Sequence, residues 1–326
     1  MGKRVGQNAM TNSASVLGLD MSNTLPLQIG ELYVPVAELG SGGSATVYRC
    51  KDASGRHVAV KKYHAHYSEG KYRQRLATEA QHLARSTSPH VVRLLDWGKD
   101  TDGSPYLVME LADGCLSDLT VYGAVGIPLA AWITYQAASG LRTAAAIHRD
   151  LKPENLLIMC GTNGSRDFQM GTTTGARIVV ADWELCKPEG VIGPTKTQDI
   201  QGTPVYMSPE QCRSLRDTDK RTDIYSLGII LWELCFGSPP FDAQNPFEII
   251  DLQINAEPSW PKGQPPALIR ILSLCLAKAP ELRYGSFAAL QEDLKPLFSS
   301  DVHWTYPPDG PPDTSMNGPI QEAREI

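Results

Sequence analysis

The sequence predicts an α+β fold of two lobes, a small β-rich N-lobe and a larger helical C-lobe, with a cleft between them. Short runs rich in β-branched and aromatic residues lie in the first third of the chain, at Val58–Tyr63, Val91–Leu95 and Tyr106–Leu111. Longer helix-like apolar patterning follows at 222–236 and 265–297. Strands in the front half and helices in the back half therefore indicate two lobes.

Composition restricts the class of protein. The 326 residues are 42% hydrophobic and 20% charged, as expected for one two-lobed domain or two small ones. The formal net charge of -6 gives no basic surface that would attract nucleic acid. No apolar run approaches the roughly 18 to 20 residues that span a bilayer. The seven cysteines are scattered and never form C-x-x-C, which favours reduced thiols and an intracellular, cytoplasmic protein.

Both ends of the chain have the composition of tails. Residues 1–30 are rich in Ser, Asn and Gly, and residues 300–326 are rich in Pro among mostly acidic charges. We therefore expect a flexible leader at 1–30, a folded domain at 31–299 and a disordered tail at 300–326. The N-terminus has no secretory apolar region. Met1-Gly2 suggests myristoylation, but Gly6 stands where that motif requires Ser or Thr.

The first chemical element is a glycine-rich run after a predicted strand that ends at Leu39. It reads Gly40-Ser41-Gly42-Gly43-Ser44-Ala45-Thr46-Val47. Glycine has no Cβ, so the backbone amides of such a run can approach nucleotide phosphates closely. Alone, the run is weak evidence, because a flexible Gly/Ser turn has the same composition.

A lysine and a glutamate lie in predicted elements that follow the glycine-rich run. Val58-Ala59-Val60-Lys61 lies on a predicted strand, and Glu79 lies in a helical segment at 75–85. A lone strand-end lysine is usually a solvated surface charge, and a lone helical glutamate is usually exposed. Leu83, one turn after Glu79, is expected to face inward.

The most informative stretch is His148-Arg149-Asp150-Leu151-Lys152-Pro153-Glu154-Asn155. It combines a proton acceptor, cations and a metal-binding amide in one short loop. A second acidic residue, Asp182, follows the strand-like run Ile178-Val179-Val180-Ala181. Together with the glycine-rich run and Lys61, these motifs resemble the protein kinase family over about residues 32–298. Ala45 replaces the third glycine of the family's G-x-G-x-x-G-x-V.

The resemblance implies the two-lobed protein kinase fold, with an N-lobe at 31–112, a C-lobe at 113–299, and ATP and Mg²⁺ bound in the cleft. Asp150 would accept the proton of the acceptor hydroxyl and Lys152 would neutralise charge, while Asn155 and Asp182 would hold the metal. Lys61 would position the phosphates and Glu79 would pair with Lys61, which completes the implied catalytic set. The implied nucleotide contacts are Gly40, Gly42, Gly43, Ala45, Val47, Ala59, Lys61, Met109, Glu110, Ala112 and Leu157. Met109 would be the gatekeeper, although it also suits plain core filling.

Motifs further along the chain extend the resemblance. Ser208-Pro209-Glu210 corresponds to the family's A-P-E, and Glu210 would pair with Arg283. Asp223 begins a run similar to D-x-W-S-L-G and would brace the catalytic loop. Pro239-Pro240-Phe241 follows as in the family.

Four departures from the family's pattern bear on activity. Trp183 replaces the Phe of D-F-G, a conservative packing change, and Glu184 replaces its Gly. We favour a Glu184 side chain that reaches water, since this avoids burying a charge; the alternative is an altered metal affinity and a restricted segment. The connection from Gly140-Leu141 to His148 is shorter than usual by about three residues, and the segment before Asp182 is longer by roughly a dozen, centred on a solvent loop at 161–176.

The resemblance favours a serine/threonine protein kinase, because Lys152 and Thr203 match that class. A protein substrate is implied. Arg149 would form an ion pair with a phosphate on the activation segment, which suggests control by phosphorylation and an upstream kinase. Thr195 and Thr197 are the candidate acceptors, or else unmodified loop residues. The alternative is a nucleotide-binding pseudokinase, supported by Glu184, Ala45 and the short connection but opposed by the retention of Lys61, Glu79, Asp150, Asn155 and Asp182. A small-molecule kinase is a third, weaker interpretation.

Overall fold

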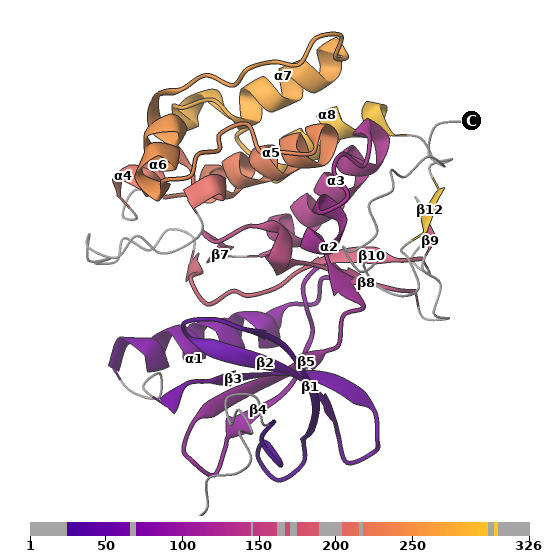
Figure 1. Ribbon diagram of the computed structural model, residues 1–326, viewed down its shortest axis with the longest axis vertical. Coiled ribbons are helices and arrows are strands. Elements are labelled where there is room, and N and C mark those ends of the chain that lie inside the picture. Colours follow the sequence, from indigo (N-terminus) through magenta and orange to yellow (C-terminus); the bar gives the residue numbers. More distant parts are fainter. Residues whose placement is uncertain are drawn as a thin grey trace, which may run out of the picture.

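The computed structural model describes residues 25–65, 70–144, 146–161, 167–169, 175–188, 204–214, 218–298 and 303–305. It has two lobes: a sheet with one helix, and a larger helical part (Figure 1). The leader up to residue 24, the tail after 305, most of the 161–176 insertion, and Thr195, Thr197 and Thr203 lie outside the described residues. No helix in the described part of the chain is long and apolar enough to cross a membrane.

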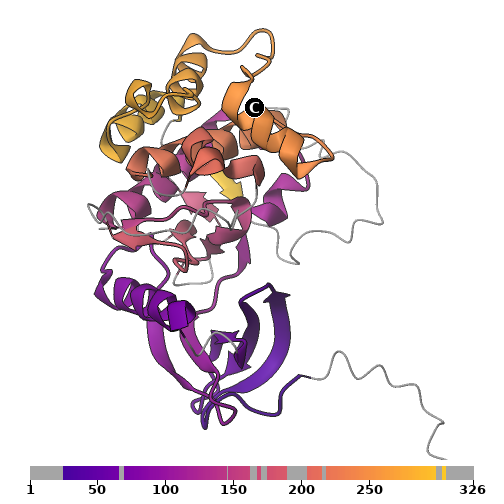
Figure 2. The same cartoon turned by 90° about the vertical axis from the view of Figure 1, so that its left-hand side faces the viewer.

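The N-lobe is a five-stranded antiparallel sheet in the order β1-β2-β3-β5-β4. Its strands are β1 (Val34–Ser41), β2 (Ala45–Lys51), β3 (His57–Tyr63), β4 (Leu94–Lys99) and β5 (Pro105–Glu110). The helix α1 (Gly70–Arg85) packs beside the sheet on the side that faces the C-lobe (Figures 1 and 2). The predicted strands at Val58–Tyr63 and Tyr106–Leu111 are confirmed as β3 and β5 within one residue at each end.

Two boundaries in the N-lobe differ from the sequence prediction. Ile29, assigned to the flexible leader, is fully buried, and the N–H of Gly30 donates to Asp100, so the folded lobe begins before residue 31. The strand expected at Val91–Leu95 begins later, as β4 at Leu94. Val91 and Val92 are buried where the lobes meet, and the N–H of Val92 donates to the carbonyl of Val180. Val91 forms an isolated parallel bridge with Val180, so this stretch is buried between the lobes without extending into a longer strand.

The C-lobe is built from seven α-helices among the described residues. These are α2 (Ser117–Thr120), α3 (Ile127–Thr143), α4 (Pro209–Arg213), α5 (Lys220–Phe236), α6 (Pro246–Asn255), α7 (Pro266–Cys275) and α8 (Phe287–Leu294). The prediction of a helix at 222–236 is confirmed by α5, which is buried along nearly its whole length and forms the centre of the lobe. The stretch at 265–297 is divided, because α7 ends at Cys275 and Pro280–Leu282 forms a separate 3₁₀ turn before α8.

Short strands position the loops of the cleft. β6 (Gly114–Cys115), β8 (Leu156–Met159) and β10 (Arg177–Val180) form one antiparallel sheet, and β7 (Ala146–Ile147) pairs with β11 (Lys187–Pro188). Because β8 and β10 are adjacent and antiparallel, Asn155 and Ala181 lie side by side, with the N–H of Ala181 donating to the carbonyl of Asn155. The segments that bear Asn155 and Asp182 therefore meet at one edge of this sheet.

The insertion and the tail contain structure that the sequence analysis did not predict. Within the 161–176 segment, β9 (Asp167–Gln169) pairs antiparallel with β12 (His303–Thr305) from the tail (Figure 1). The expectations of a pure solvent loop and a wholly disordered tail are therefore wrong at these residues. The residue types at this pairing, Phe168 opposite Trp304, suit strands better than the composition of either segment as a whole.

Candidate active site

The glycine-rich run forms the turn of the β1–β2 hairpin. The N–H of Gly42 donates to the carbonyl of Ala45 at 2.9 Å, and the hydroxyls of Ser41 and Thr46 lie 2.9 Å apart across the hairpin. A Cβ placed on Gly40 or Gly43 would meet no atom within 4 Å, and one on Gly42 only the carbonyl of Ala45 at 3.9 Å. Packing within the protein thus does not require these glycines, and the space beside them is open to a ligand.

Lys61 on β3 lies at the centre of the charged groups of the cleft. Its Nζ is 2.6 Å from Asp182 Oδ1 and 3.2 Å from Glu79 Oε1. Glu79, on α1, is fully buried and also accepts a hydrogen bond from the hydroxyl of Tyr63. Burial alone would lower the pKa of Lys61, but the carboxylates of Asp182 and Glu79 raise it well above its usual value. Lys61 is therefore a charged group that links the sheet, α1 and the C-lobe.

The catalytic-loop residues are fixed by main-chain hydrogen bonds to Asp223 at the start of α5. The N–H groups of His148 and Arg149 donate to its two carboxylate oxygens at 2.8 and 2.9 Å. Arg149 has a φ of 68°, a left-handed conformation that these bonds help to hold. His148 is buried and lies 2.8 Å from the carbonyl of Ala181 through Nε2. The shortened connection after α3 therefore still delivers His148 and Asp150 to the cleft.

Asp150, Lys152 and Asn155 form one cluster. Lys152 Nζ lies 3.1 Å from Asp150 Oδ2, and Asn155 Nδ2 donates to the carbonyl of Asp150 at 2.8 Å. Burial raises the pKa of Asp150 to about 6, and the charge of Lys152 only partly offsets that shift. The carboxyl thus titrates close to neutral pH, as suits a proton acceptor.

Trp183 occupies the buried position that the sequence analysis expected. It is fully buried, and its ring lies 4.1 Å from that of His82 on α1 and 4.7 Å from that of His148, centroid to centroid. Leu83, also on α1, is buried as predicted. A large ring at this position therefore connects α1 with the catalytic loop.

Glu184 does not reach solvent, so the favoured expectation for this residue is wrong. Its side chain is 12% exposed, accepts a hydrogen bond from Ser44 Oγ at 2.7 Å and lies 3.6 Å from Lys61 Nζ. The carboxylate is turned into the cleft because a hydroxyl donor and an ammonium group are both within reach. Asp182 has a positive φ of 61°, whereas Glu184 does not have a positive φ. The replacement of the family's Gly by Glu184 therefore causes no left-handed backbone strain.

The strand that leads from the N-lobe to the C-lobe carries the expected adenine-contact residues. Met109 on β5 is buried opposite Ala59 on β3, while Ala112 and Leu157 pack against the core. The N–H of Glu110 already donates to the carbonyl of Arg93 at 3.1 Å, so that group is engaged within the protein. Val47 lies on β2 next to the glycine-rich turn and in register with Lys61. These residues are on the elements that border Lys61, as the sequence implied.

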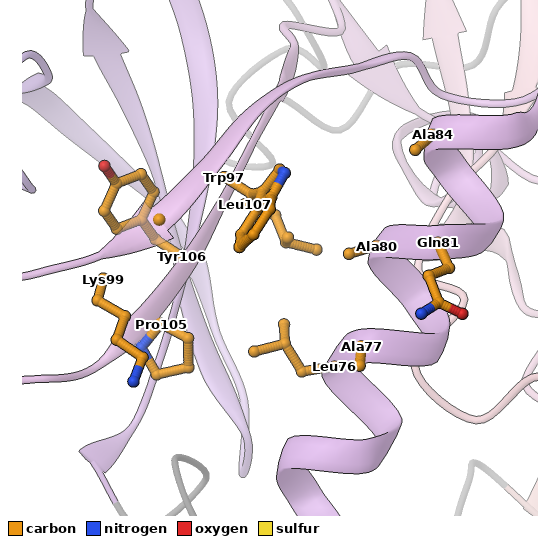
Figure 3. Close-up of a pocket in the computed structure, with 11 residues that line it drawn as sticks. Leu76, Ala77, Ala80, Gln81, Ala84, Trp97, Lys99, Pro105, Tyr106 and Leu107 are labelled. Carbon is orange, nitrogen blue, oxygen red and sulfur yellow. The ribbon is translucent and has the colours of Figure 1, made fainter.

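A cavity of about 470 Å³ lies elsewhere, between α1 and strands β4 and β5 (Figure 3). Leu76 and Ala80 from α1 and Trp97 and Leu107 from the strands border it. None of the charged cleft residues described above lines it, so it has no part in the chemistry of this site.

Three residues of the site were missed from the sequence alone. The hydroxyl of Tyr63 bonds Glu79, Gln211 Nε2 donates to the carbonyl of Arg149 at 2.7 Å, and Ser44 bonds Glu184. The two-residue period of a strand could have found Tyr63, since it shares a face with Lys61. No local pattern indicates the other two, because both contacts join segments far apart in the sequence.

Comparison with known proteins agrees with this geometry. A family model described as protein kinase domain matches residues 33–294. A probable serine/threonine-protein kinase of Corynebacterium efficiens is 31% identical over 292 residues, covering 84% of this chain and 42% of the relative. The serine/threonine-protein kinase PknL of Mycobacterium bovis is 31% identical over 276 residues, covering 81% of this chain and 65% of the relative. This chain thus spans between about two fifths and two thirds of the length of these relatives.

Proposed function

The chain belongs to the protein kinase family, and on that premise we propose that it transfers the γ-phosphate of ATP to serine or threonine hydroxyls of protein substrates. The observation that carries the proposal is the position of Lys61, whose ammonium contacts both Glu79 and Asp182. Phosphoryl transfer in this family requires the Lys–Glu pair and the metal-binding Asp to be in place together. A chain that had lost this chemistry would not need to hold all three groups in contact.

The residues present fit ATP and Mg²⁺. The open space beside Gly40, Gly42 and Gly43 suits phosphates held by backbone amides, and Lys61 supplies the cation beneath them. The amide oxygen of Asn155 and the carboxylate of Asp182 are oxygen ligands of the type that Mg²⁺ prefers. When bound, the metal would neutralise charge on the transferred phosphoryl group.

The protein's own part in the reaction is positioning and proton transfer. Asp150 would orient the acceptor hydroxyl and take its proton, and the buried position that raises its pKa suits it for this role. Lys152, 3.1 Å from Asp150, would stabilise negative charge that develops on the phosphoryl oxygens. Asp223 holds the loop that carries both residues, through the backbone N–H groups of His148 and Arg149.

Substrate class and regulation belong to the same proposal. Lys152 and the names of the relatives both support a serine/threonine acceptor. Arg149 Nε donates to the carbonyl of Leu185 at 2.7 Å, so this cation already contacts the start of the activation segment. A phosphate on Thr195 or Thr197, added by an upstream kinase or in trans, would add negative charge to that segment. An intracellular location is also proposed, because none of the seven cysteines forms a disulfide.

A nucleotide-binding pseudokinase is the second candidate, and Glu184 is the observation that favours it. Its carboxylate contacts Lys61, the cation that an ATP phosphate would need. One experiment separates the two candidates: purified protein is incubated with Mg-ATP and a generic Ser/Thr substrate, beside an Asp150→Asn control. Phosphate on the substrate in the wild type alone supports the kinase. No transfer, with an ATP-dependent rise in melting temperature, would leave the pseudokinase.

A further inference from the structure

The contacts of Glu184 join the two lobes across the cleft. Ser44 lies in the glycine-rich turn of the N-lobe, and Glu184 lies two residues after Asp182 in the C-lobe. A single carboxylate oxygen, Oε2, accepts the Ser44 hydrogen bond at 2.7 Å and lies 3.6 Å from Lys61 Nζ. The carboxylate thus sits between a glycine-rich-loop donor and the lysine of β3.

The partners of this carboxylate are those a bound phosphate would use. An anion in this cleft would meet the glycine-rich turn on one side and the Lys61 ammonium on the other. The Glu184 carboxylate is such an anion, attached to the protein itself. It is only 12% exposed, so its interactions with Ser44 and Lys61 are weakly screened by water.

The loop side of this contact is held by main-chain bonds. The carbonyl of Ser44 accepts a hydrogen bond from the N–H of His64 at the end of β3, at 2.9 Å, and the adjacent turn is closed by the Gly42 N–H bond to Ala45. Two backbone bonds therefore fix the main chain at and beside Ser44. The hairpin thus places the Ser44 hydroxyl within hydrogen-bond distance of Glu184.

Three carboxylates already share the Lys61 ammonium with which a bound phosphate would interact. Asp182, Glu79 and Glu184 all lie within 3.6 Å of its one ammonium group. Glu79 is buried and bound to Tyr63, and Asp182, two residues after β10, lies 2.6 Å from Lys61 Nζ. The contacts of the Glu184 side chain within the described part of the chain are one hydrogen bond and the longest of the three ion pairs, so it is the carboxylate that an incoming phosphate would displace first.

We propose that Glu184 is an internal competitor of the nucleotide phosphates, which bridges Ser44 and Lys61 in the nucleotide-free chain and must leave for a phosphate to bind. The inference rests on the proposed nucleotide-binding function but concerns a residue that the proposed phosphoryl transfer does not require. If the bridge between Ser44, Glu184 and Lys61 is formed in about nine-tenths of the molecules, only about one tenth can bind a phosphate. The apparent affinity for ATP is then about tenfold weaker. Binding of the nucleoside part would not be affected.

The test compares ATP with adenosine, which has no phosphate. Affinities are measured by calorimetry in EDTA for the wild type, Glu184→Gln and Ser44→Ala. Glu184→Gln removes the charge but keeps an acceptor for Ser44, and it is expected to tighten ATP about tenfold while changing adenosine less than about twofold. Ser44→Ala alters no charge and removes a donor from the bridge and from a bound phosphate alike, so ATP affinity is expected to change less than about twofold.

Three further measurements separate the bridge from general charge repulsion. Glu38→Gln removes an exposed carboxylate from β1 and is expected to leave both affinities unchanged. At about 0.5 M salt, long-range repulsion is largely screened, yet the gain in Glu184→Gln is expected to persist. In the nucleotide-free protein, Ser44→Ala is expected to speed hydrogen exchange of the amides at 40–47, because the loop loses its contact with the C-lobe.

Each remaining result has one meaning. Equal ATP affinity in the wild type and Glu184→Gln would overturn the proposal, as would a gain that is equally large for adenosine or that disappears in salt. Weaker ATP binding in Glu184→Gln would show that the carboxylate helps to bind nucleotide and would also overturn it. Failure of the wild type to bind either ATP or adenosine would instead contradict the proposed function.

Discussion

The carboxylate of Glu210 and the guanidinium of Arg283 form a bidentate ion pair, with Nη1–Oε1 and Nη2–Oε2 distances of 2.7 and 2.8 Å. The Arg283 side chain is fully buried, and it also donates to the carbonyls of Ala277, Lys278 and Arg221. The pair joins the start of α4, which ends the activation segment, to the segment before α8. It therefore holds the end of the activation segment against the segment before α8.

Arg283→Met is expected to destabilise the protein by about 3 to 5 kcal/mol, because it leaves a partly buried carboxylate and several carbonyls without their donor. Urea unfolding measures the change. Arg270→Met is the matched control: Arg270 pairs with Asp293 at 2.7 Å but is 64% exposed, so its loss should cost less than about 1 kcal/mol. Equal costs for the two variants would contradict a structural role for the Glu210–Arg283 pair.

The same pair predicts a loss of stability in acid. Burial alone would raise the pKa of Glu210, but hydrogen bonds and charge from Arg283 lower it below its usual value of 4.5. Because the pKa is lower in the folded state than in the unfolded state, the stabilisation is complete above about pH 4.5 and is lost as pH falls through the folded-state pKa. Urea unfolding across pH 3 to 6 should show a shallower acid slope in Glu210→Gln than in the wild type, and parallel slopes would refute this assignment.

Much of the site can be predicted because its short motifs resemble those of the protein kinase family. That resemblance implies roles for Lys61, Glu79 and Asp182, and in the structure the Lys61 ammonium contacts both carboxylates. It also implies the pairing of Glu210 with Arg283, which the structure shows. The short motifs identify the residues, and the resemblance supplies contacts between segments that lie far apart in the sequence.

The direction of the Glu184 side chain could not be predicted in the same way. Burying a charge is costly, so solvent was the reasonable expectation from one residue considered alone. The outcome depends on Ser44, 140 residues earlier, lying within hydrogen-bond distance. The pairing of β9 with β12 was missed for a related reason, since strand pairing between distant segments leaves no local period that identifies the partner.

Asp223→Asn is expected to impair catalysis more than folding. The N–H groups of His148 and Arg149 use separate oxygens of Asp223, and in Asn one of these becomes an NH2 donor, so one bond is lost and the loop that carries Asp150 should shift. A misplacement of about 1 Å can reduce turnover about 100-fold, whereas one lost buried hydrogen bond costs about 1 to 3 kcal/mol. Turnover and urea unfolding are measured on the same preparation.

Asp219→Asn is the control for this variant, because Asp219 caps the same helix through the N–H of Arg221 and Asn caps nearly as well. It should change turnover and stability little. A large loss of turnover in this control would attribute the effect to the start of α5 as a whole and not to the Asp223 bonds.

Lys61→Met is expected to destabilise the fold as well as to abolish transfer. It leaves Glu79 fully buried without its cation, at a cost of about 3 to 5 kcal/mol. Adding Glu79→Gln to the same chain should recover part of that loss, since the second change removes the unpaired charge. A double-mutant cycle by urea unfolding measures the coupling, and strictly additive costs would mean that the 3.2 Å pair contributes nothing to stability.

Trp183→Phe is expected to weaken the protein without removing activity. The indole is fully buried between His82 and His148, so a smaller ring leaves unfilled space and costs about 1 to 3 kcal/mol. Phe still reaches the same neighbours, as in the family's D-F-G, and transfer should stay within about threefold of the wild type. Trp232→Phe, a buried tryptophan of α5 that packs on Phe236 and Trp260, should show a similar stability loss with no change in transfer. A loss of transfer above about tenfold in Trp183→Phe alone, at a temperature where both variants are folded, would show that the indole positions the catalytic loop in a way that Phe cannot.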